Sequence, residues 1–199
     1  ATDIELDVLP TRYVYAGIPP RPQGVYDLLV DGRLARQASA TGGDVVTIDM
    51  AAGTASKQQG PAGTLRFGGL PGGAKRIEIW LPHNETTELV ALRANAPVEP
   101  LAGDARKVWL HHGSSISHGG EADGPRGPWA QRAATELGLE LTDLGFSGNA
   151  LLDPFVARTI AAERADVITL KLGINIVNID GMRRRTLLPA LHNYLDIIR

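Results

Sequence analysis

The sequence predicts an α/β chain in two parts, an antiparallel β-sandwich followed by an α/β/α domain. In the first half, short segments of alternating apolar and polar residues are separated by glycine and proline clusters. From about residue 103, apolar strands instead alternate with segments of helical pattern. The 23 glycines and 13 prolines exclude an all-helical bundle, and a hydrophobic content of 43% is enough for a folded core.

The β-sandwich is predicted over residues 1–97, with a jelly-roll-like arrangement. Alternation buries one face of each strand and exposes the other, which is typical of antiparallel sheets. It is clearest in residues 3–8, 45–49 and 76–81, and turns are expected at residues 17–20, 42–43, 60–61 and 71–73.

A connector with two prolines follows at residues 93–100, and the second domain is predicted over residues 103–199. Its strands are nearly continuous apolar runs, which indicates parallel strands covered on both faces. We expect strands at residues 107–111, 139–144 and 166–172, and helices at residues 129–137, 154–164 and 181–199.

Polar turns follow each of these three strands, at residues 112–117, 145–149 and 173–175. Ligands of open parallel sheets bind beyond the carboxyl ends of the strands, so we expect these turns to meet. They offer serine hydroxyls, backbone N–H groups in glycine turns and a side-chain amide. This combination suits acyl transfer, in which each N–H that stabilises the oxyanion contributes roughly 3 kcal/mol.

The same residues resemble a known family. Gly113-Ser114-Ser115-Ile116, residues 143–149 and Gly173-Ile174-Asn175 are similar to the first three sequence blocks of the SGNH hydrolases, also called GDSL esterases and lipases. The resemblance implies a flavodoxin-like α/β/α domain in which Ser115 is the nucleophile. It also implies an oxyanion hole formed by the N–H of Ser115, the N–H of Gly148 and the side chain of Asn175. Ser114 replaces an Asp of many members, as in the subgroup that begins with Gly-Ser-Ser.

The first half extends this resemblance. Residues 24–28 and 79–82 are similar to the small sandwich domain that precedes the catalytic domain in one subgroup. Members of that subgroup are commonly esterases that remove acetyl groups from carbohydrates. The resemblance therefore implies a carbohydrate O-deacetylase that acts on a small-molecule or carbohydrate ester and needs no cofactor.

One element of the family pattern is missing. The general base of the family is the His of an Asp-x-x-His pair, and no His of this sequence has Asp three positions before it. The sequence ends at Arg199 within a predicted helix. We therefore expect a hydrolase domain truncated at its C-terminus, with the base beyond residue 199. The other interpretation is a degenerate family member, and either would leave this chain a slow esterase.

Each candidate residue has a simpler structural interpretation. Ser115 is a typical helix N-cap, Gly148 fits a turn that needs a positive φ, and Asn175 fits a turn or cap. Ser147 is a second candidate nucleophile, because Gly145-Phe146-Ser147-Gly148 is close to the Gly-x-Ser-x-Gly elbow, although the final glycine is Asn149. The position of the three family residues after consecutive strands favours their functional roles.

His111, His112 and His118 flank Ser115, which is one reason to consider a metal site. They lack a carboxylate partner in the sequence, so we predict no metal site.

Two other functions stay open at this point. A non-catalytic carbohydrate-binding or scaffold protein would also fit a hydrolase domain that has lost its base. A lipase or thioesterase of the same family would fit the three motifs equally well.

Composition restricts the partners. A net charge of −2 gives no basic surface for nucleic acid, and no apolar run is long enough to cross a membrane. Without cysteine there is no disulfide or thiol nucleophile, which suits the cytoplasm or a cysteine-free secreted protein. The sequence given has no signal peptide at its start, and it does not indicate an oligomeric state.

Overall fold

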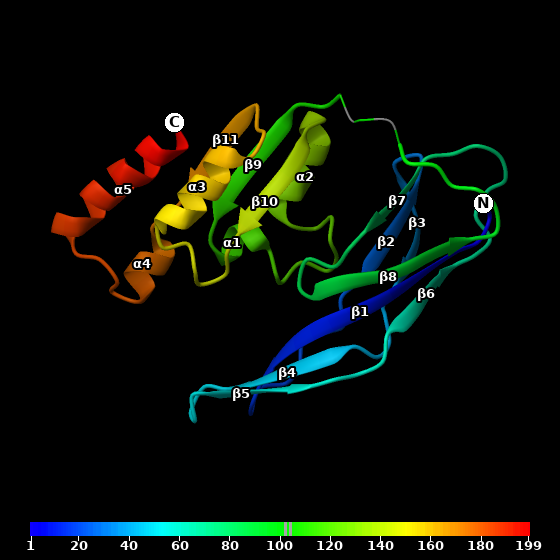
Figure 1. Cartoon of the computed structure of the whole chain (residues 1–199), viewed down its shortest axis with the longest axis horizontal. Helices are drawn as coiled ribbons and strands as arrows, with labels where there is room; N and C mark the ends of the chain where they lie inside the picture. The colour runs from blue at the N-terminus through cyan, green and yellow to red at the C-terminus, as the bar shows by residue number, and fades with distance from the viewer. Residues whose placement is uncertain (102, 104) are drawn as a thin grey trace. The chain divides into compact units, whose positions relative to one another are not determined.

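The computed structural model describes residues 1–101, 103 and 105–199. Contacts divide the chain into two compact units, which we name the N-terminal unit (Ala1–Ala102 with Asp123–Pro125) and the C-terminal unit (Gly103–Ala122 with Arg126–Arg199). The N-terminal unit consists of strands, and the C-terminal unit contains both strands and helices (Figure 1). The predicted α/β class is confirmed.

Two sheets form the N-terminal unit. In the larger sheet, β1 pairs with β4, β6 and β8, and β5 pairs with β4. In the smaller sheet, β2 lies between β3 and β7. The strands are β1 (Ile4–Tyr15), β2 (Tyr26–Val30), β3 (Arg33–Ala38), β4 (Asp44–Asp49), β5 (Thr54–Gln58), β6 (Gly63–Phe67), β7 (Ile77–Trp80) and β8 (Thr86–Ala94).

Both sheets contribute to one hydrophobic core. The first half of β1 alternates strictly, so that Ile4, Leu6 and Val8 are buried while Glu5 and Asp7 point away from the core. The smaller sheet adds buried side chains from β2, and the larger sheet adds others from β6: Tyr26 and Leu28, and Leu65 and Phe67.

One pairing departs from the antiparallel prediction. β1 and β4 are parallel, with residues 11–15 of β1 beside residues 44–48 of β4. The other pairs described in this unit are antiparallel. The chain leaves β1, builds β2 and β3 in the other sheet, and returns beside β1 in its original direction. Alternation reports which face of a strand is buried and not the direction of its neighbour, so the sequence pattern could not reveal this crossover.

A partly buried ion pair connects strand β1 to three loops of this unit. Arg12 Nε donates to Glu85 Oε1 at 2.8 Å, and the side chain of Glu85 is only 4% exposed. The same oxygen accepts the N–H of Gly24 at 2.6 Å, while Arg12 Nη2 donates to the carbonyl of Ala40 at 2.7 Å. Strand β1 is thereby connected to the loops that precede β2, β4 and β8.

The C-terminal unit is built on a three-stranded parallel sheet in which β9 lies between β10 and β11 (Figure 1). Strands and helices alternate along this unit, with two helices after β9 and two after β11. They are β9 (Val108–Gly113), α1 (Ser115–His118), α2 (Trp129–Leu137), β10 (Glu140–Gly145), α3 (Pro154–Ala162), β11 (Val167–Lys171), α4 (Ile174–Asn178) and α5 (Arg184–Ile198).

Helices cover both faces of this sheet. Leu110 packs with buried residues of α3, α4 and α5, whereas its neighbour Trp109 packs with Ala130 and Ala134 of α2. Successive side chains of a strand point to opposite faces, so α2 lies on one face and α3 with α5 on the other. The six residues of β9 are all buried, as its apolar run predicts, whereas the same prediction is wrong for β11, four of whose five residues are exposed because it is an edge strand of the described sheet.

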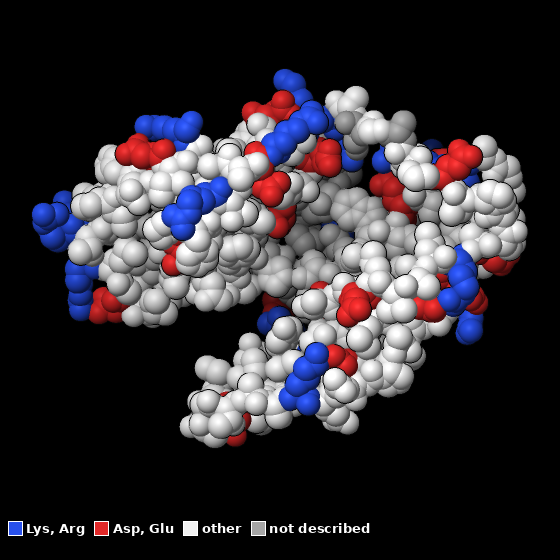
Figure 2. All heavy atoms as spheres, in the orientation of Figure 1, with Lys and Arg blue, Asp and Glu red and all other residues white. Residues whose placement is uncertain are grey.

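Two further properties bear on partners. Among the described residues, no helix combines the length and the apolar character that crossing a bilayer requires. On the face shown in Figure 2, acidic and basic side chains are interspersed.

The Arg12–Glu85 pair gives a stability prediction. We expect Glu85→Ala to lower the free energy of unfolding by about 3 kcal/mol, because it removes the carboxylate beside a largely buried guanidinium and leaves Nε of Arg12 and the N–H of Gly24 without their acceptor. Urea unfolding measures this loss. Arg66→Ala is the matched control, since Arg66 pairs with Glu5 on the surface and should cost at most about 1 kcal/mol. Equal losses in the two variants would contradict the assignment.

Candidate active site

Ser115 is the first residue of α1 and is exposed directly after the buried strand β9. The N-cap of this helix is Ser114, which is fully buried and makes no side-chain capping bond. The interpretation of Ser115 as an N-cap is therefore wrong. Its hydroxyl is not bonded to any other described residue's side chain or backbone.

Two glycines allow α1 to lie directly against the strand ends. A Cβ on Gly113 would be 2.2 Å from Oγ of Ser117, and a Cβ on Gly145 would be 2.2 Å from the backbone N of His118. Both distances are far shorter than any real contact of a Cβ atom. The carboxyl ends of β9 and β10 must therefore be glycine for the one-turn helix to occupy this position.

The turn after β10 lies beside α1. Gly145 is aligned with Gly113, and the N–H of Phe146 donates to the carbonyl of Gly113 at 2.7 Å. Gly148 follows with a φ of +77°, a conformation that glycine adopts without strain. Within the described part of the chain, the N–H groups of Ser115 and Gly148 have no hydrogen-bond acceptor.

Asn175 joins the same edge from β11, whose last residue Lys171 is also aligned with Gly113. It lies in the short helix α4 and is 5% exposed. Its Oδ1 accepts the N–H of Ala150 at 3.0 Å. A backbone N–H needs an oxygen acceptor here, so the amide orientation is fixed and Nδ2 remains to donate. The three predicted residues thus lie in the segments that follow three neighbouring strands, at one edge of the sheet.

His111 and His112 are buried on opposite faces of β9. His111 is hydrogen-bonded to Thr169 Oγ1 and Ser117 Oγ, each at 2.8 Å. His112 Nδ1 is hydrogen-bonded to the carbonyl of Leu144 at 2.7 Å. Burial lowers the pKa of both imidazoles, so both are neutral at neutral pH.

His118, the last residue of α1, connects the helix to the Gly148 turn. Its Nδ1 is hydrogen-bonded to Oγ of Ser147 at 2.7 Å. Partial burial raises the pKa of nearby Asp143 to about 6, although its side chain keeps contact with solvent. A hydrogen bond from the N–H of Gly145 and the charge of His118 lower the pKa and so oppose that rise. Ser147 thus has the imidazole neighbour that Ser115 lacks.

Several contacts around the candidate residues were not predicted: His111 with Ser117, His118 with Ser147, and Ala150 with Asn175. The strand pattern around His111 and His112 is the sequence signal that could have shown that these two neighbours face different layers. No sequence signal indicated which hydroxyl each imidazole would meet. Among the described residues, no group of three or more His, Asp or Glu is arranged to hold a metal ion.

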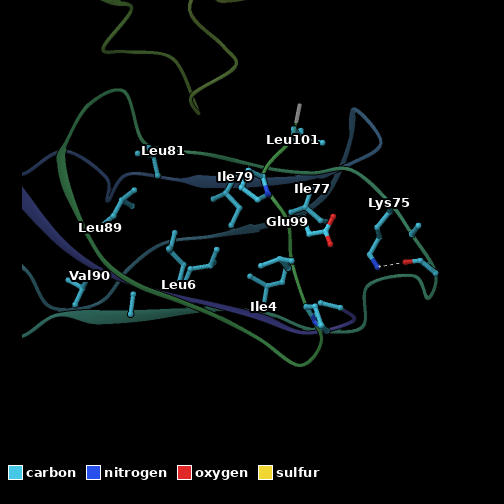
Figure 3. Close-up of a pocket in the computed structure, with 18 residues that line it drawn as sticks. Ile4, Leu6, Lys75, Ile77, Ile79, Leu81, Leu89, Val90, Glu99 and Leu101 are labelled. Carbon is cyan, nitrogen blue, oxygen red and sulfur yellow. Dashed lines mark hydrogen bonds between the residues drawn. The ribbon is translucent and has the colours of Figure 1, made fainter. Parts of the chain in front are cut away.

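A separate cavity of about 1080 Å³ lies within the N-terminal unit. Aliphatic side chains of β1, β7 and β8 line it, including Leu6, Ile79 and Leu89. Two charged residues, Lys75 and Glu99, also line it (Figure 3). None of the described residues that line it is aromatic. Because sugars commonly stack on aromatic rings, this cavity has no stacking surface for a carbohydrate.

No protein-family model matches the chain, and no curated protein matches it significantly by sequence. Solved structures do match. A salicylyl-acyltransferase, SsfX3, from a tetracycline biosynthetic pathway is 28% identical with a TM-score of 0.80, and the match covers 100% of this chain and 52% of that one.

Two further structures are more distant in sequence. A GDSL-like lipase from Bacteroides ovatus, described as putative, is 17% identical with a TM-score of 0.68, over 99% of this chain and 53% of that one. A family two carbohydrate esterase from Clostridium thermocellum, solved with cellohexaose, is 13% identical with a TM-score of 0.69, over 100% of this chain and 64% of that one. The chain thus spans between half and two thirds of the length of these proteins. The resemblance to the SGNH hydrolases is confirmed at the level of the fold, which the chain shares with the GDSL-like lipase and the carbohydrate esterase, whereas the resemblance of the first half to the two-domain subgroup stays a prediction.

Proposed function

We propose that the protein is a serine ester hydrolase in which Ser115 is the nucleophile. The oxyanion hole is formed by the N–H of Ser115, the N–H of Gly148 and Nδ2 of Asn175. Acyl-transfer chemistry is also that of the acyltransferase to which the chain is most similar among the three structures described above. The fold shared with a lipase and a carbohydrate esterase adds support.

One observation carries this proposal: the bond between Ala150 and Asn175. It holds the amide oxygen of Asn175 at 3.0 Å from a backbone N–H, so the group that remains beside the Gly148 turn is a donor. A preorganised donor is what a developing oxyanion requires.

The chemical step is acyl transfer to a hydroxyl. Ser115 Oγ attacks the ester carbonyl and its proton passes to a base; the C–O bond to the alcohol then breaks, and the alcohol leaves with that proton. Water hydrolyses the acyl-enzyme in the same way. His111 and His112 are unsuited as the base, because both are buried and bonded to other groups. We place the base in the Asp-x-x-His element of the family, outside residues 1–199.

The substrate class we propose is an acetylated carbohydrate, which the enzyme would deacetylate. The likeness to a carbohydrate esterase solved with cellohexaose supports this class. Because the apolar cavity of the N-terminal unit has no aromatic lining, we place the sugar at the C-terminal edge of β9 and not in that cavity. Transfer of an acyl group to an alcohol other than water is the second candidate function, supported by the greater identity to the acyltransferase.

For the domains, we propose a jelly-roll-like β-sandwich over residues 1–97 and the front part of the hydrolase domain over residues 103–199. The core shared by the two sheets of the N-terminal unit supports the sandwich. The parallel sheet covered by helices on both faces supports the hydrolase domain.

Ser147 is the competing nucleophile. Its hydroxyl is 2.7 Å from an imidazole nitrogen of His118, and the N–H of Gly148 directly follows it. We favour Ser115 because it matches the family position. Ser147 lies one residue before Gly148, and its bond to His118 also connects the turn to α1, which is a structural role. The two serines can be separated by experiment.

The first test compares two matched variants, Ser115→Ala and Ser147→Ala. In the natural polypeptide that contains these residues, we expect Ser115→Ala to lower the kcat for p-nitrophenyl acetate by at least about 100-fold, because the nucleophile is lost. Ser147→Ala should stay within about 5-fold, since it removes only one bond of the turn. Undiminished turnover in Ser115→Ala contradicts the proposal, and loss only in Ser147→Ala assigns the nucleophile to Ser147. Absence of turnover in all forms supports a non-catalytic binding protein.

The second test concerns the oxyanion donor. Asn175→Asp keeps an oxygen for the N–H of Ala150 but replaces the donor with a negative charge. We expect kcat to fall by about 100-fold or more while KM changes little. The control is the melting temperature, which should remain near that of the parent protein. A decrease in kcat below 5-fold would exclude Asn175 from the oxyanion hole.

The third test defines the substrate. We expect acetylated xylo- and cello-oligosaccharides to be hydrolysed with a higher kcat/KM than long-chain p-nitrophenyl esters. Product analysis in the presence of a simple alcohol separates hydrolysis from transfer, because a transferase forms the new ester in preference to free acid. A preference for long acyl chains would indicate a lipase and contradict the carbohydrate assignment.

A further inference from the structure

His111 is a buried imidazole that the proposed reaction does not use. It lies in the middle of β9, four residues before Ser115, and is 2% exposed. Buried polar groups are nearly always hydrogen-bonded, so the partners of this side chain indicate its role.

The two ring nitrogens of His111 connect two different elements. One is hydrogen-bonded to Oγ1 of Thr169 on β11, and the other to Oγ of Ser117 on α1, each at 2.8 Å. Thr169 Oγ1 also accepts the indole N–H of Trp109 at 2.8 Å. A neutral imidazole has one donor and one acceptor nitrogen, and this site uses both.

Two indole rings hold the plane of this imidazole. The ring centroid of His111 is 5.7 Å from that of Trp109 and 5.0 Å from that of Trp129, which meets it edge to face. Trp129 is the first residue of α2. Contacts with β9, β11 and α2 therefore fix the imidazole independently of its bond to α1.

Helix α1 is too short to hold its position by itself, and the bond from Ser117 to His111 is one of its contacts, beside that of His118 with Ser147. It has four residues, and its N-cap side chain makes no capping bond. Isolated helices of this length are unstable in water, so α1 depends on tertiary contacts. Ser117 provides one of them: it is fully buried, its hydroxyl meets His111, and it occupies the space that a side chain on Gly113 would need.

We propose that His111 is a positioning residue for the nucleophile, acting through Ser117 to fix α1 and thereby Ser115. This inference rests on the proposed function of Ser115. Ser117 lies two residues after Ser115 in the same helical turn, so loss of its bond frees the element that carries the nucleophile. A displacement of about 1 Å at a reacting atom can cost about 100-fold in rate, while the binding of the substrate is affected less.

The experiment compares Ser114, which precedes Ser115, with Ser117, which lies two residues after it. Both side chains are fully buried, but Ser117 is bonded to His111, whereas Ser114 Oγ has no hydrogen-bond partner among the described residues. We expect Ser117→Ala to lower kcat for p-nitrophenyl acetate by about 10-fold or more with KM within about 2-fold. Ser114→Ala, the matched control, should leave both constants within about 2-fold. Equal effects of the two substitutions would overturn the proposal.

Variants at position 111 provide a second comparison that separates bonding from packing. His111→Gln keeps a polar group able to reach Ser117, whereas His111→Leu fills the space without a hydrogen bond. We expect His111→Gln to retain at least about 5-fold more kcat than His111→Leu at a temperature where both are folded by circular dichroism. Equal kcat values in these two variants would contradict a role for the hydrogen bond.

Amide hydrogen exchange gives a readout that does not depend on the esterase assignment. In the parent protein and in Ser114→Ala, we expect slow exchange for the amides of Ser117 and His118. In Ser117→Ala and His111→Leu, we expect exchange at least about 10-fold faster at these amides, with little change in α3. Faster exchange without a decrease in kcat would show that the bond is structural only and would overturn the proposal. If Ser115→Ala leaves turnover intact, the assignment of Ser115 as the nucleophile fails. Unchanged exchange in Ser117→Ala would separately contradict the role of the Ser117–His111 bond in holding α1.

Discussion

The close approach of α1 to the ends of β9 and β10 is the constraint on which the candidate site depends. Any side chain on Gly113 or Gly145 would overlap atoms of Ser117 or His118, so the helix reaches this position only because both strands end in glycine. From that contact follow the exposure of Ser115, the bond between Ser117 and His111, and the proximity of the Gly148 turn. The reactive serine is thus set by backbone packing and by hydrogen bonds from buried side chains, not by the helix in which it lies.

Charge acts differently in the two units. In the N-terminal unit, Arg12 and Glu85 are largely removed from water and satisfy backbone groups as well as each other, which makes their loss costly. In the C-terminal unit, the buried polar groups near the candidate site include two histidines, whose pKa burial lowers. A neutral imidazole can connect two hydroxyls without the desolvation cost of a buried charge, which suits a group that orients its neighbours.

The sequence predicted much of the C-terminal unit. Helix α2 begins and ends where the pattern placed it, and the three strands lie within two residues of their predicted bounds. Helix α5 begins at Arg184 rather than at residue 181, because Arg183 has an extended backbone and is the N-cap of the helix. Prediction was less complete in the N-terminal unit, where alternation located strands but not the parallel partner of β1. Periodicity is a local property, whereas strand pairing joins residues far apart in the chain.

The sequence by itself determined the types of chemical group that the site can use: a serine hydroxyl, glycine N–H groups and an amide, each directly after a strand. Motif order determined this, because parallel strands bring their carboxyl ends to one edge. Only the tertiary structure decided how those groups are oriented. It showed that the oxygen of Asn175 is held by Ala150, that His118 meets Ser147, and that His111 meets Ser117. These contacts depend on side-chain directions across three adjacent loops, and no pattern along a single strand or helix specifies them.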